Sequence, residues 1–359
     1  MSDSIEQWRE RVRAAAAADA PLNLRGGGTK AFYGRMPVGA VLDTRAHRGV
    51  VNYEPTELVV TVRAGTPLAE LEALLAERNQ VLAFEPPHFG EGATVGGCVA
   101  AGLSGPRRAT AGAVRDFVLG VKILDGRGEV LSFGGEVMKN VAGYDVSRVI
   151  AGSLGTLGLI LDVSLKVLPR PVAETTLRFE LNEADAISRL NDWAAQPLPL
   201  SASAWHDGTL TLRLSGAETA VRAAERRLGG AALPAPVADA FWRGVREQDN
   251  EFFAPVATGA EDVLWRLSLP SSAAPLKLAG PQFIEWGGAL RWLHCDAPAA
   301  SIRERVASLG GHATAFRGGD GDGEIFQPLP APLMAIHRRL KAAFDPAGIF
   351  NPGRLYQGL

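Results

Sequence analysis

The spacing of apolar side chains predicts two amphipathic helices within the first eighty residues. Both place apolar residues three or four positions apart, on one helical face: Ile5, Trp8 and Val12 in the first, and Leu68, Leu71 and Leu75 in the second. In the second helix, Thr66 is expected to cap the first turn and Pro67 to take the first helical position. Short β-rich runs surround this helix, so the first half of the chain mixes helices and strands.

Strand periodicity is clearest between residues 159 and 167, where five apolar residues alternate with polar ones. Asp162, Ser164 and Lys166 fall on the opposite face, which predicts a half-buried strand. Upstream, the sequence "DGRG" at residues 125–128 predicts a turn between two further strands.

Two prolines, Pro169 and Pro171, interrupt the strand pattern and indicate a domain boundary near this point. Beyond it, short strands alternate with helical stretches, which predicts an α+β second domain. We therefore divide the chain into a first domain of residues 1–171, a second domain of residues 172–330, and a C-terminal segment of residues 331–359 that begins with a helix.

The charge balance argues against nucleic acid and membrane surfaces as partners. The 37 lysines and arginines are nearly balanced by 39 aspartates and glutamates, and no basic run is present. The first twenty residues carry acids and arginines instead of the apolar core of a secretory signal, and no apolar stretch approaches about eighteen residues. We therefore expect a cytoplasmic protein without direct membrane insertion, associated with a membrane only through partner subunits.

Cys98 and Cys295 are the two cysteines of the chain. Two thiols cannot supply the usual four-cysteine ligation of an iron–sulfur cluster, so any such centre has to lie on another protein. The six histidines show no pair at the spacing of metal ligands, and no metal site is predicted.

The segment "LRGGGTKAFYGR" (24–35) contains three consecutive glycines, which suggests a backbone folded around an anion. It is not a nucleotide-binding P-loop, because Thr29 precedes Lys30 and no Ser or Thr follows the lysine. The glycines of "AGSLGTLG" (151–158) do not fit a Rossmann fingerprint, because a helix-like stretch precedes them and a strand follows. For the triple glycine taken alone, an ordinary flexible turn is the alternative.

Three glycine-rich segments taken together favour a larger ligand: residues 26–28, 92–105 and 141–160. Because glycine lacks a Cβ atom, successive backbone N–H groups can approach a diphosphate closely, and Arg25 and Lys30 add positive charge. A ligand that contacts all three segments, with a pyrophosphate in its middle, is a dinucleotide such as FAD.

The order and spacing of several motifs resemble the vanillyl-alcohol-oxidase type flavoproteins, and among them the FAD-binding subunits of bacterial glycolate oxidases. The motifs are "RGGGTK", "EPPHFGEGATVGG", "GPRRATAGAVRDFVLG", "GGEVMKNVAGYD", "GSLGTLG" and "FNPGR", with "WRLSLP", "EWGGALRWL" and "GGHATAF" in the second half. The resemblance implies an α+β fold: a PCMH-type two-lobed FAD-binding domain, completed by the C-terminal segment, with a smaller α+β cap domain over the flavin ring.

The resemblance also implies which residues bind FAD, with residues 25–30 as the pyrophosphate loop. The implied set is Arg25, Gly26, Gly27, Gly28, Thr29, Lys30, Thr94, Val95, Gly96, Gly97, Arg115, Asp116, Lys139, Asn140, Tyr144, Asp145, Gly155, Thr156, Leu157, Gly158, Ile160 and Asn351. For Asp145 a helix N-cap is an equal alternative. Residues 25–35 contain no His or Cys, so FAD is expected to bind non-covalently; His88 and Cys98 are the nearest alternative attachment points.

Flavin-dependent oxidation of a 2-hydroxy acid requires a cation for the carboxylate and a base for the hydroxyl proton. Arg266 and Arg291 are the candidate cations, and His312 is the candidate base. Each has a structural alternative as a surface or inter-strand charge partner.

The resemblance implies an FAD-binding subunit of a multi-subunit complex that oxidises glycolate to glyoxylate. Electrons would pass to partners, a homologous flavoprotein subunit and an iron–sulfur subunit. The alternatives are a non-catalytic FAD-binding scaffold, and a stand-alone flavin oxidoreductase for another 2-hydroxy acid such as D-lactate. The docking surface is hypothesised to include "EWGGALRWL" (285–293), for which the core of the cap domain is the alternative.

Overall fold

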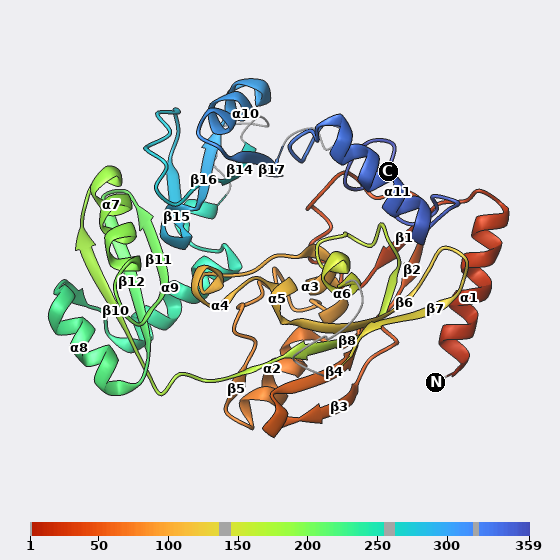
Figure 1. Ribbon diagram of the computed structural model, residues 1–359, viewed down its shortest axis with the longest axis horizontal. Coiled ribbons are helices and arrows are strands. Elements are labelled where there is room, and N and C mark those ends of the chain that lie inside the picture. The colour runs from red at the N-terminus through yellow and green to blue at the C-terminus, as the bar shows by residue number, and fades with distance from the viewer. Residues whose placement is uncertain (1, 136–144, 255–262, 319–322) are drawn as a thin grey trace.

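The computed structural model describes residues 2–135, 145–254, 263–318 and 323–359. Figure 1 shows two bodies side by side, each built on its own β-sheet. The first body contains a five-stranded antiparallel sheet of order β3-β4-β8-β6-β7. Its strands are β3 (Val50–Glu54), β4 (Val59–Arg63), β6 (Val118–Leu124), β7 (Val130–Gly134) and β8 (Leu159–Lys166).

Strand β8 is the central strand of this sheet, between β4 and β6. The apolar alternation correctly predicts a half-buried strand: its five alternating apolar residues are buried, whereas Asp162 and Lys166 on the other face are partly exposed. Ile160 and Ser164 are buried, and Asp162 pairs with His47 (Oδ1–Nε2 3.1 Å) and with Lys122 (Oδ2–Nζ 2.9 Å). The polar face of β8 is therefore only partly exposed, and charge pairing satisfies its acid. The turn predicted at residues 125–128 lies between β6 and β7.

The helices of the first body pack into its hydrophobic cores. They are α1 (Ser2–Ala17), α2 (Leu68–Ala76), α3 (Val95–Ala101), α4 (Arg108–Ala111), α5 (Val114–Phe117) and α6 (Val146–Ile150). The predicted apolar stripes of α1 and α2 pack into the core, with Val12 and Leu68 fully buried. The predicted cap of α2 was wrong by one residue: Pro67 is the N-cap, and Thr66 Oγ1 accepts a hydrogen bond from the backbone N–H of Gly49 (2.9 Å) instead.

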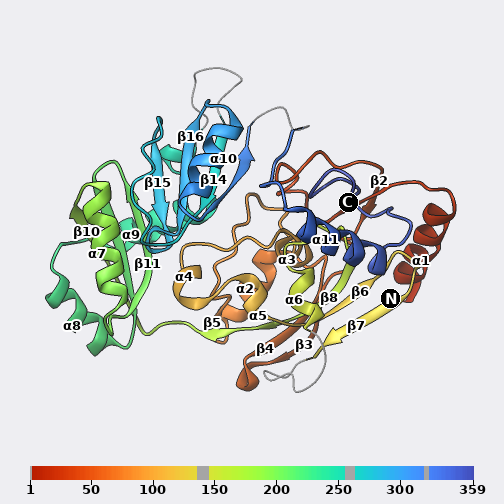
Figure 2. The same cartoon turned by 45° about the horizontal axis from the view of Figure 1, so that its top comes forward.

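A second lobe is formed by both ends of the chain. Strands β1 (Leu22–Arg25) and β2 (Ala40–Asp43) pair in parallel, and Leu22 also bridges to Phe350 near the C-terminus. Figures 1 and 2 show the closing helix α11 (Ala331–Phe344) on the side of the first body that carries these strands. The C-terminal segment thus returns to the first body.

The second body is the cap, an eight-stranded antiparallel sheet of order β13-β10-β12-β11-β15-β16-β14-β17. Its outer face packs against α7, α8 and α10, and its inner face packs against α9 and the first body. The proposed boundary at residues 171/172 falls between the two sheets. The elements are β10 (Ala173–Glu180), α7 (Glu183–Ala194), β11 (Leu200–His206), β12 (Thr209–Gly216), α8 (Glu218–Leu228), β13 (Ala231–Ala232), α9 (Ala235–Glu247), β14 (Val263–Ser268), β15 (Gln282–Glu285), β16 (Leu290–Cys295), α10 (Ala299–Ser308) and β17 (His312–Arg317).

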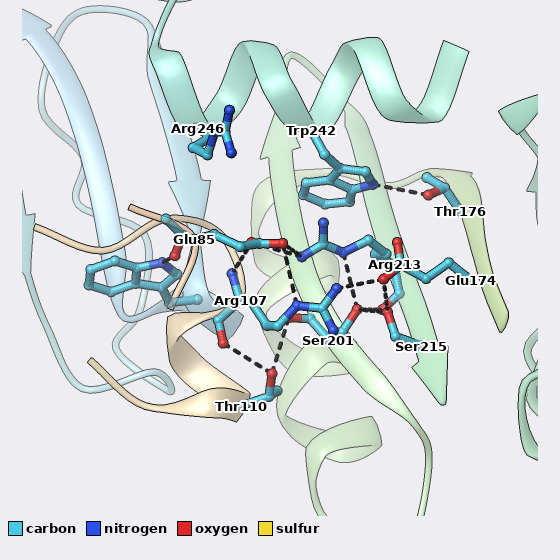
Figure 3. Close-up of polar contacts among 12 residues, drawn as sticks. Glu85, Arg107, Thr110, Glu174, Thr176, Ser201, Arg213, Ser215, Trp242 and Arg246 are labelled. Atoms are coloured by element: carbon cyan, nitrogen blue, oxygen red, sulfur yellow. Dashed lines mark hydrogen bonds and ion pairs between the residues drawn. The ribbon is translucent and has the colours of Figure 1, made fainter. Parts of the chain in front are cut away.

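A polar network joins the two bodies. Glu85, in the loop after β5 (Gln80–Val81), accepts two hydrogen bonds from Arg213 of β12 (2.8 and 2.9 Å) and one from Arg107 Nε (3.3 Å). Figure 3 shows both guanidinium groups directed at the Glu85 carboxylate, with Arg107 also bonded to Glu174 of β10. This network holds the cap against the first body.

The hypothesis that residues 285–293 form an exposed docking surface was wrong. Within this segment Glu285, Trp286, Gly288, Leu290, Arg291, Trp292 and Leu293 are all buried. The segment runs from the end of β15 into β16, an interior strand of the cap sheet whose two faces are both covered. The structure therefore agrees with the alternative, in which the segment is cap core.

One buried ion pair docks α11 onto the first body. Lys341 Nζ donates to Asp345 Oδ2 (2.7 Å) and to the backbone carbonyls of Thr156 (2.8 Å) and Phe350 (2.6 Å). Asp345 also accepts from the backbone N–H groups of Ile349 and Phe350. The pair thus fixes the turn that leads into the C-terminal strand-like segment.

Lys341→Ala should lower the free energy of unfolding by about 3 kcal/mol, because the substitution leaves a buried carboxylate without its cation. Urea unfolding followed by circular dichroism measures the change. Arg338→Ala, at an exposed position of the same helix, is the matched control and should change stability by less than about 0.5 kcal/mol. Equal effects of the two substitutions would contradict the docking role of Lys341.

Candidate functional site

A pocket lies between the two lobes of the first body. Its enclosed volume is about 200 Å³. Thirteen residues of the predicted FAD set line it: Arg25, Gly26, Gly27, Gly28, Thr29, Lys30, Thr94, Gly96, Gly97, Gly155, Gly158, Ile160 and Asn351. The three glycine-rich segments therefore meet at one pocket.

The triple glycine sits where no side chain can be accommodated. A Cβ atom on Gly26 would lie 2.4 Å from Thr94 Oγ1, and one on Gly27 would lie 1.5 Å from the carbonyl oxygen of Gly92. Gly28 has a φ of +75°, in the left-handed region that favours glycine. The loop after β1 is thus pressed against the segment that precedes α3.

The same loop presents a row of unused donors. Within the described ranges, the backbone N–H groups of residues 26–30 donate to no acceptor of the protein, and these residues are only partly exposed. Successive unpaired N–H groups in a glycine turn form an anion-binding nest. A diphosphate fits this loop, so the residues present are compatible with FAD.

Two side chains of the loop are fixed by the segment around His88. Thr29 Oγ1 and Lys30 Nζ both donate to the His88 carbonyl (2.7 and 3.1 Å). Burial lowers the pKa of Lys30, although Cys98 and Glu247 act in the opposite direction. Glu247, from α9 of the cap, accepts from the backbone N–H groups of His88 and Phe89 (3.0 and 2.9 Å). The cap therefore helps to position the loop that supports the pocket.

Asn351 closes the pocket from the C-terminal side. Its Oδ1 accepts from the backbone N–H of Leu24 (2.8 Å), and its Nδ2 donates to the Leu154 carbonyl (2.6 Å). Asn351 adopts a positive φ of 42°, and its Nδ2 would lie 2.7 Å from any Cβ atom on Gly155. The terminal segment thus ties β1 to the third glycine-rich segment.

Several predicted FAD residues lie outside the pocket lining. Val95 and Leu157 belong to the main hydrophobic core, and Thr156 Oγ1 donates to the Ser153 carbonyl. Arg115 is exposed, Asp116 accepts from the backbone N–H of Ala113, and Asp145 caps α6. Lys139, Asn140 and Tyr144 lie outside the described residues. The family resemblance implied these residues motif by motif, and a shared motif does not fix the direction of each side chain.

Arg354 was missed as a lining residue, although it ends the quoted motif "FNPGR". Its guanidinium group donates to the carbonyls of Ala31, Tyr33 and Arg35, and burial lowers its pKa to about 10. An arginine that binds three carbonyls of one segment fixes the backbone of that segment. Other lining residues that sequence reasoning missed are Asn23, Leu24, Ala31, Pro37, Thr44, Ala64, Ala100, Ala101, Leu154 and Leu159.

The proposed attachment points for a covalent flavin do not line the pocket. Burial raises the pKa of the Cys98 thiol to about 12, so the thiolate that would react is scarce at neutral pH. His88 Nε2 is bonded to Glu72 (3.0 Å). Both observations support the expectation that FAD binds without a covalent link.

The three candidate catalytic residues occupy different environments. Arg266 and His312 lie on the inner face of the cap sheet, where Arg266 pairs with Thr314 and His312 with Ser268. Partial burial and then Arg266 lower the pKa of His312, so its imidazole is neutral at pH 7. Arg291 is fully buried and donates to the carbonyls of Gly288, Ala273 and Ala274. This setting favours the structural alternative for Arg291.

Glu285, which sequence reasoning did not single out, is a buried acid on the same inner face. Its side chain accepts from Trp292 Nε1 (2.7 Å), and burial raises its pKa to about 7, partly opposed by this hydrogen bond and by Arg266. Within the described ranges no cation lies within ion-pair distance of it. An acid that titrates near neutrality at a domain interface is a candidate functional group.

Comparisons with known proteins agree with this geometry. The family of FAD binding domains matches residues 2–134, and the family of C-terminal domains of FAD linked oxidases matches residues 329–355. A structure of alkyldihydroxyacetonephosphate synthase has a TM-score of 0.66 at 15% identity, and the match covers 96% of this chain and 73% of that chain. At this identity the likeness shows the fold alone. The fold and the pocket define an FAD-binding flavoprotein of the FAD-linked oxidase class.

Curated relatives narrow this class. Glycolate oxidase subunit GlcE from Escherichia coli (strain K12) is 51% identical over 357 residues, which cover 99% of each chain. Glycolate oxidase subunit GlcD from Bacillus subtilis (strain 168) is 26% identical, with 94% of this chain and 84% of that protein covered. A D-lactate dehydrogenase from Archaeoglobus fulgidus is 32% identical over 50% of this chain and 41% of that protein. The chain belongs to the family of glycolate oxidase subunit GlcE, which confirms the resemblance in its motifs and FAD as its cofactor.

Gly27→Val should abolish FAD binding. A Cβ atom at this position would overlap the Gly92 carbonyl, so the two loops would have to separate and the row of N–H donors would be displaced. Flavin absorbance per mole of purified protein measures the loss. Gly135→Val is the control, because an added Cβ there meets nothing within 4 Å. A full complement of FAD in Gly27→Val would contradict the assignment of the pyrophosphate loop.

Proposed function

We propose that this protein is the FAD-binding subunit of a multi-subunit glycolate oxidase, which takes part in the oxidation of glycolate to glyoxylate. The observation that carries the proposal is the 51% identity with glycolate oxidase subunit GlcE over 99% of both chains. The unpaired N–H groups of residues 26–30 support it independently, since they offer the diphosphate nest that an FAD enzyme needs.

The residues of the pocket hold the cofactor in this proposal. Residues 26–30 bind the pyrophosphate, Asn351 and Arg354 fix the backbone around it, and the binding is non-covalent. FAD would accept the hydride, which carries the two electrons, from the substrate carbon.

The inner face of the cap supplies the groups that act on the substrate. Arg266 binds the carboxylate, because its guanidinium group makes no hydrogen bond or ion pair with any residue of the described ranges. His312, kept neutral by the lowered pKa, accepts the hydroxyl proton. Arg291 keeps its structural contacts and is the weaker candidate for the carboxylate.

Anaerobic addition of glycolate should bleach the flavin absorbance of the purified protein. Hydride transfer from the substrate carbon reduces the flavin, and the absence of oxygen prevents its return to the oxidised form. D-lactate in a parallel titration is the matched control for substrate identity.

The other outcomes separate the alternatives. Bleaching by D-lactate and not by glycolate would support the stand-alone oxidoreductase. A flavin that neither acid bleaches would support the scaffold, in which a related subunit performs the chemistry.

The electrons must leave through a partner. No helix of the described residues is long and apolar enough to cross a membrane, and two cysteines cannot hold an iron–sulfur cluster. We propose a homologous flavoprotein subunit and an iron–sulfur subunit as partners. The similarity of this chain to a GlcD subunit supports the first.

The lone chain should not sustain glycolate-dependent reduction of a quinone-like acceptor, and co-expression with the two proposed partners should restore it. Turnover rate and co-elution on a sizing column measure both points. Full turnover by the lone chain, or no association on co-expression, would overturn the partner proposal.

A further inference from the structure

Two arginines from different domains share one tryptophan. Trp286 follows β15 and donates its indole N–H to the Gly105 carbonyl of the first body (3.1 Å). Arg108, in α4 of the first body, lies 4.4 Å from the centre of the indole ring, and Arg266, in β14 of the cap, lies 5.3 Å from it. Two positive groups therefore lie against one indole ring where the two domains touch.

The positive charge at this place has no matching acid. Across the described residues, neither the Arg108 nor the Arg266 guanidinium group has a hydrogen bond or an ion pair. Burial lowers the pKa of Arg108, and then Arg266 and Arg115 lower it further, while Asp116 only partly compensates. Arg108 is exposed, so water screens part of this repulsion, and an anion held by both groups would remove more of it.

The nearest buried acid does not remove this excess below neutral pH. Glu285 has a pKa of about 7 because of burial, so it is largely uncharged at pH 6. The charged groups that act on it are Arg266 from the cap and Glu85 from the first body, and Arg246 of α9 lines the same cavity. The carboxyl group of Glu285 also accepts a hydrogen bond from Trp292 Nε1, but this neutral donor adds no charge to the site.

A small cavity lies beside Arg266 and Trp286, and Arg108 does not line it. This cavity, lined by Ser104, Gly105, Arg266, Glu285 and Trp286, has a volume of about 20 Å³, which is the room for a single water-sized group. One oxygen atom of a carboxylate fits this space beside Arg266, so the rest of an acid would lie outside the cavity. Burial raises the pKa of Tyr33, opposed by Arg266, so Arg266 also lies near the segment that continues the pyrophosphate loop.

We propose that Arg108 and Arg266, one from each domain, together bind the carboxylate of a small 2-hydroxy acid. The inference rests on the proposed function, which supplies the substrate class. The inference adds Arg108 to the site, so the bound carboxylate would bridge the first body and the cap. It also makes Glu285 the group that sets the pH dependence of anion binding.

Oxalate is a suitable probe, because it is a small carboxylate without a C–H bond and is not oxidised by hydride transfer. Isothermal titration of the FAD-loaded protein with oxalate should give binding that Arg108→Ala and Arg266→Ala each weaken by about tenfold or more, since each removes a charge-assisted contact. Arg189→Ala, at an exposed position of α7, should leave oxalate binding unchanged. Equal FAD content in all four proteins verifies that each variant folds.

Oxalate binding should also be several-fold tighter at pH 6 than at pH 8, because ionised Glu285 repels the anion above its pKa. Glu285→Gln keeps the shape and removes the charge, so it should abolish the difference between the two pH values. A merely structural role of Glu285 would not produce this change in the pH profile.

The inference is overturned if wild-type protein does not bind oxalate, or if Arg108→Ala binds it as tightly as wild type does. Failure of the proposed function has a different signature, since glycolate would then leave the flavin oxidised while oxalate binding still depends on both arginines. Undiminished bleaching by low concentrations of glycolate in Arg108→Ala would overturn the inference and leave the proposed function intact.

Discussion

The position of the cap against the first body depends on the carboxylate of Glu85. Burial alone would raise the pKa of this group, but Arg213 from the cap and Arg107 from the first body outweigh burial and lower it. Glu85 is therefore ionised at neutral pH and holds one guanidinium group from each domain (Figure 3). Arg213 is also stacked on Trp242, with 5.0 Å between its guanidinium carbon and the ring centre. Removal of either arginine would leave a poorly compensated charge in this interface, which is far more costly than the loss of a surface pair.

The same contact sets the geometry of both functional regions. Arg107 is the N-cap residue of α4, so binding of Arg107 to Glu85 also places the next residue, Arg108, beside Trp286. On the other side, residues 85–89 continue into the loop whose His88 carbonyl holds Thr29 and Lys30. One short segment of the first body thus connects the cofactor pocket, the cap and the paired arginines. A shift of the cap relative to this segment would change all three at once.

The sequence was sufficient to predict those elements whose pattern lies within a few neighbouring residues. Apolar periodicity identified α1, α2 and β8, and glycine spacing identified the loop at residues 26–30, because a helix stripe or a positive φ depends on neighbouring residues. Contacts between distant segments were not accessible in this way. The pairing of Glu85 with Arg213 joins residues 128 positions apart, and nothing near either residue indicates its partner. Arg354 and Glu285 were missed as functional residues for the same reason.

The misinterpretation of residues 285–293 has a more specific cause. Tryptophans and an arginine in one short segment are common at protein interfaces, so their composition suggested a docking surface. Composition does not reveal that β16 has neighbours on both edges and packed layers on both faces, which places Trp292 in the inner core and Leu293 in the outer one. Arg291 tolerates this burial because backbone carbonyls accept its N–H groups. Glu285 has no ion-pair partner among the described residues, and burial raises its pKa instead. The two charged residues of the segment therefore differ in what their burial implies. The N–H groups of Arg291 bind backbone carbonyls and hold the cap together. The carboxyl group of Glu285 can still change its charge beside Arg266.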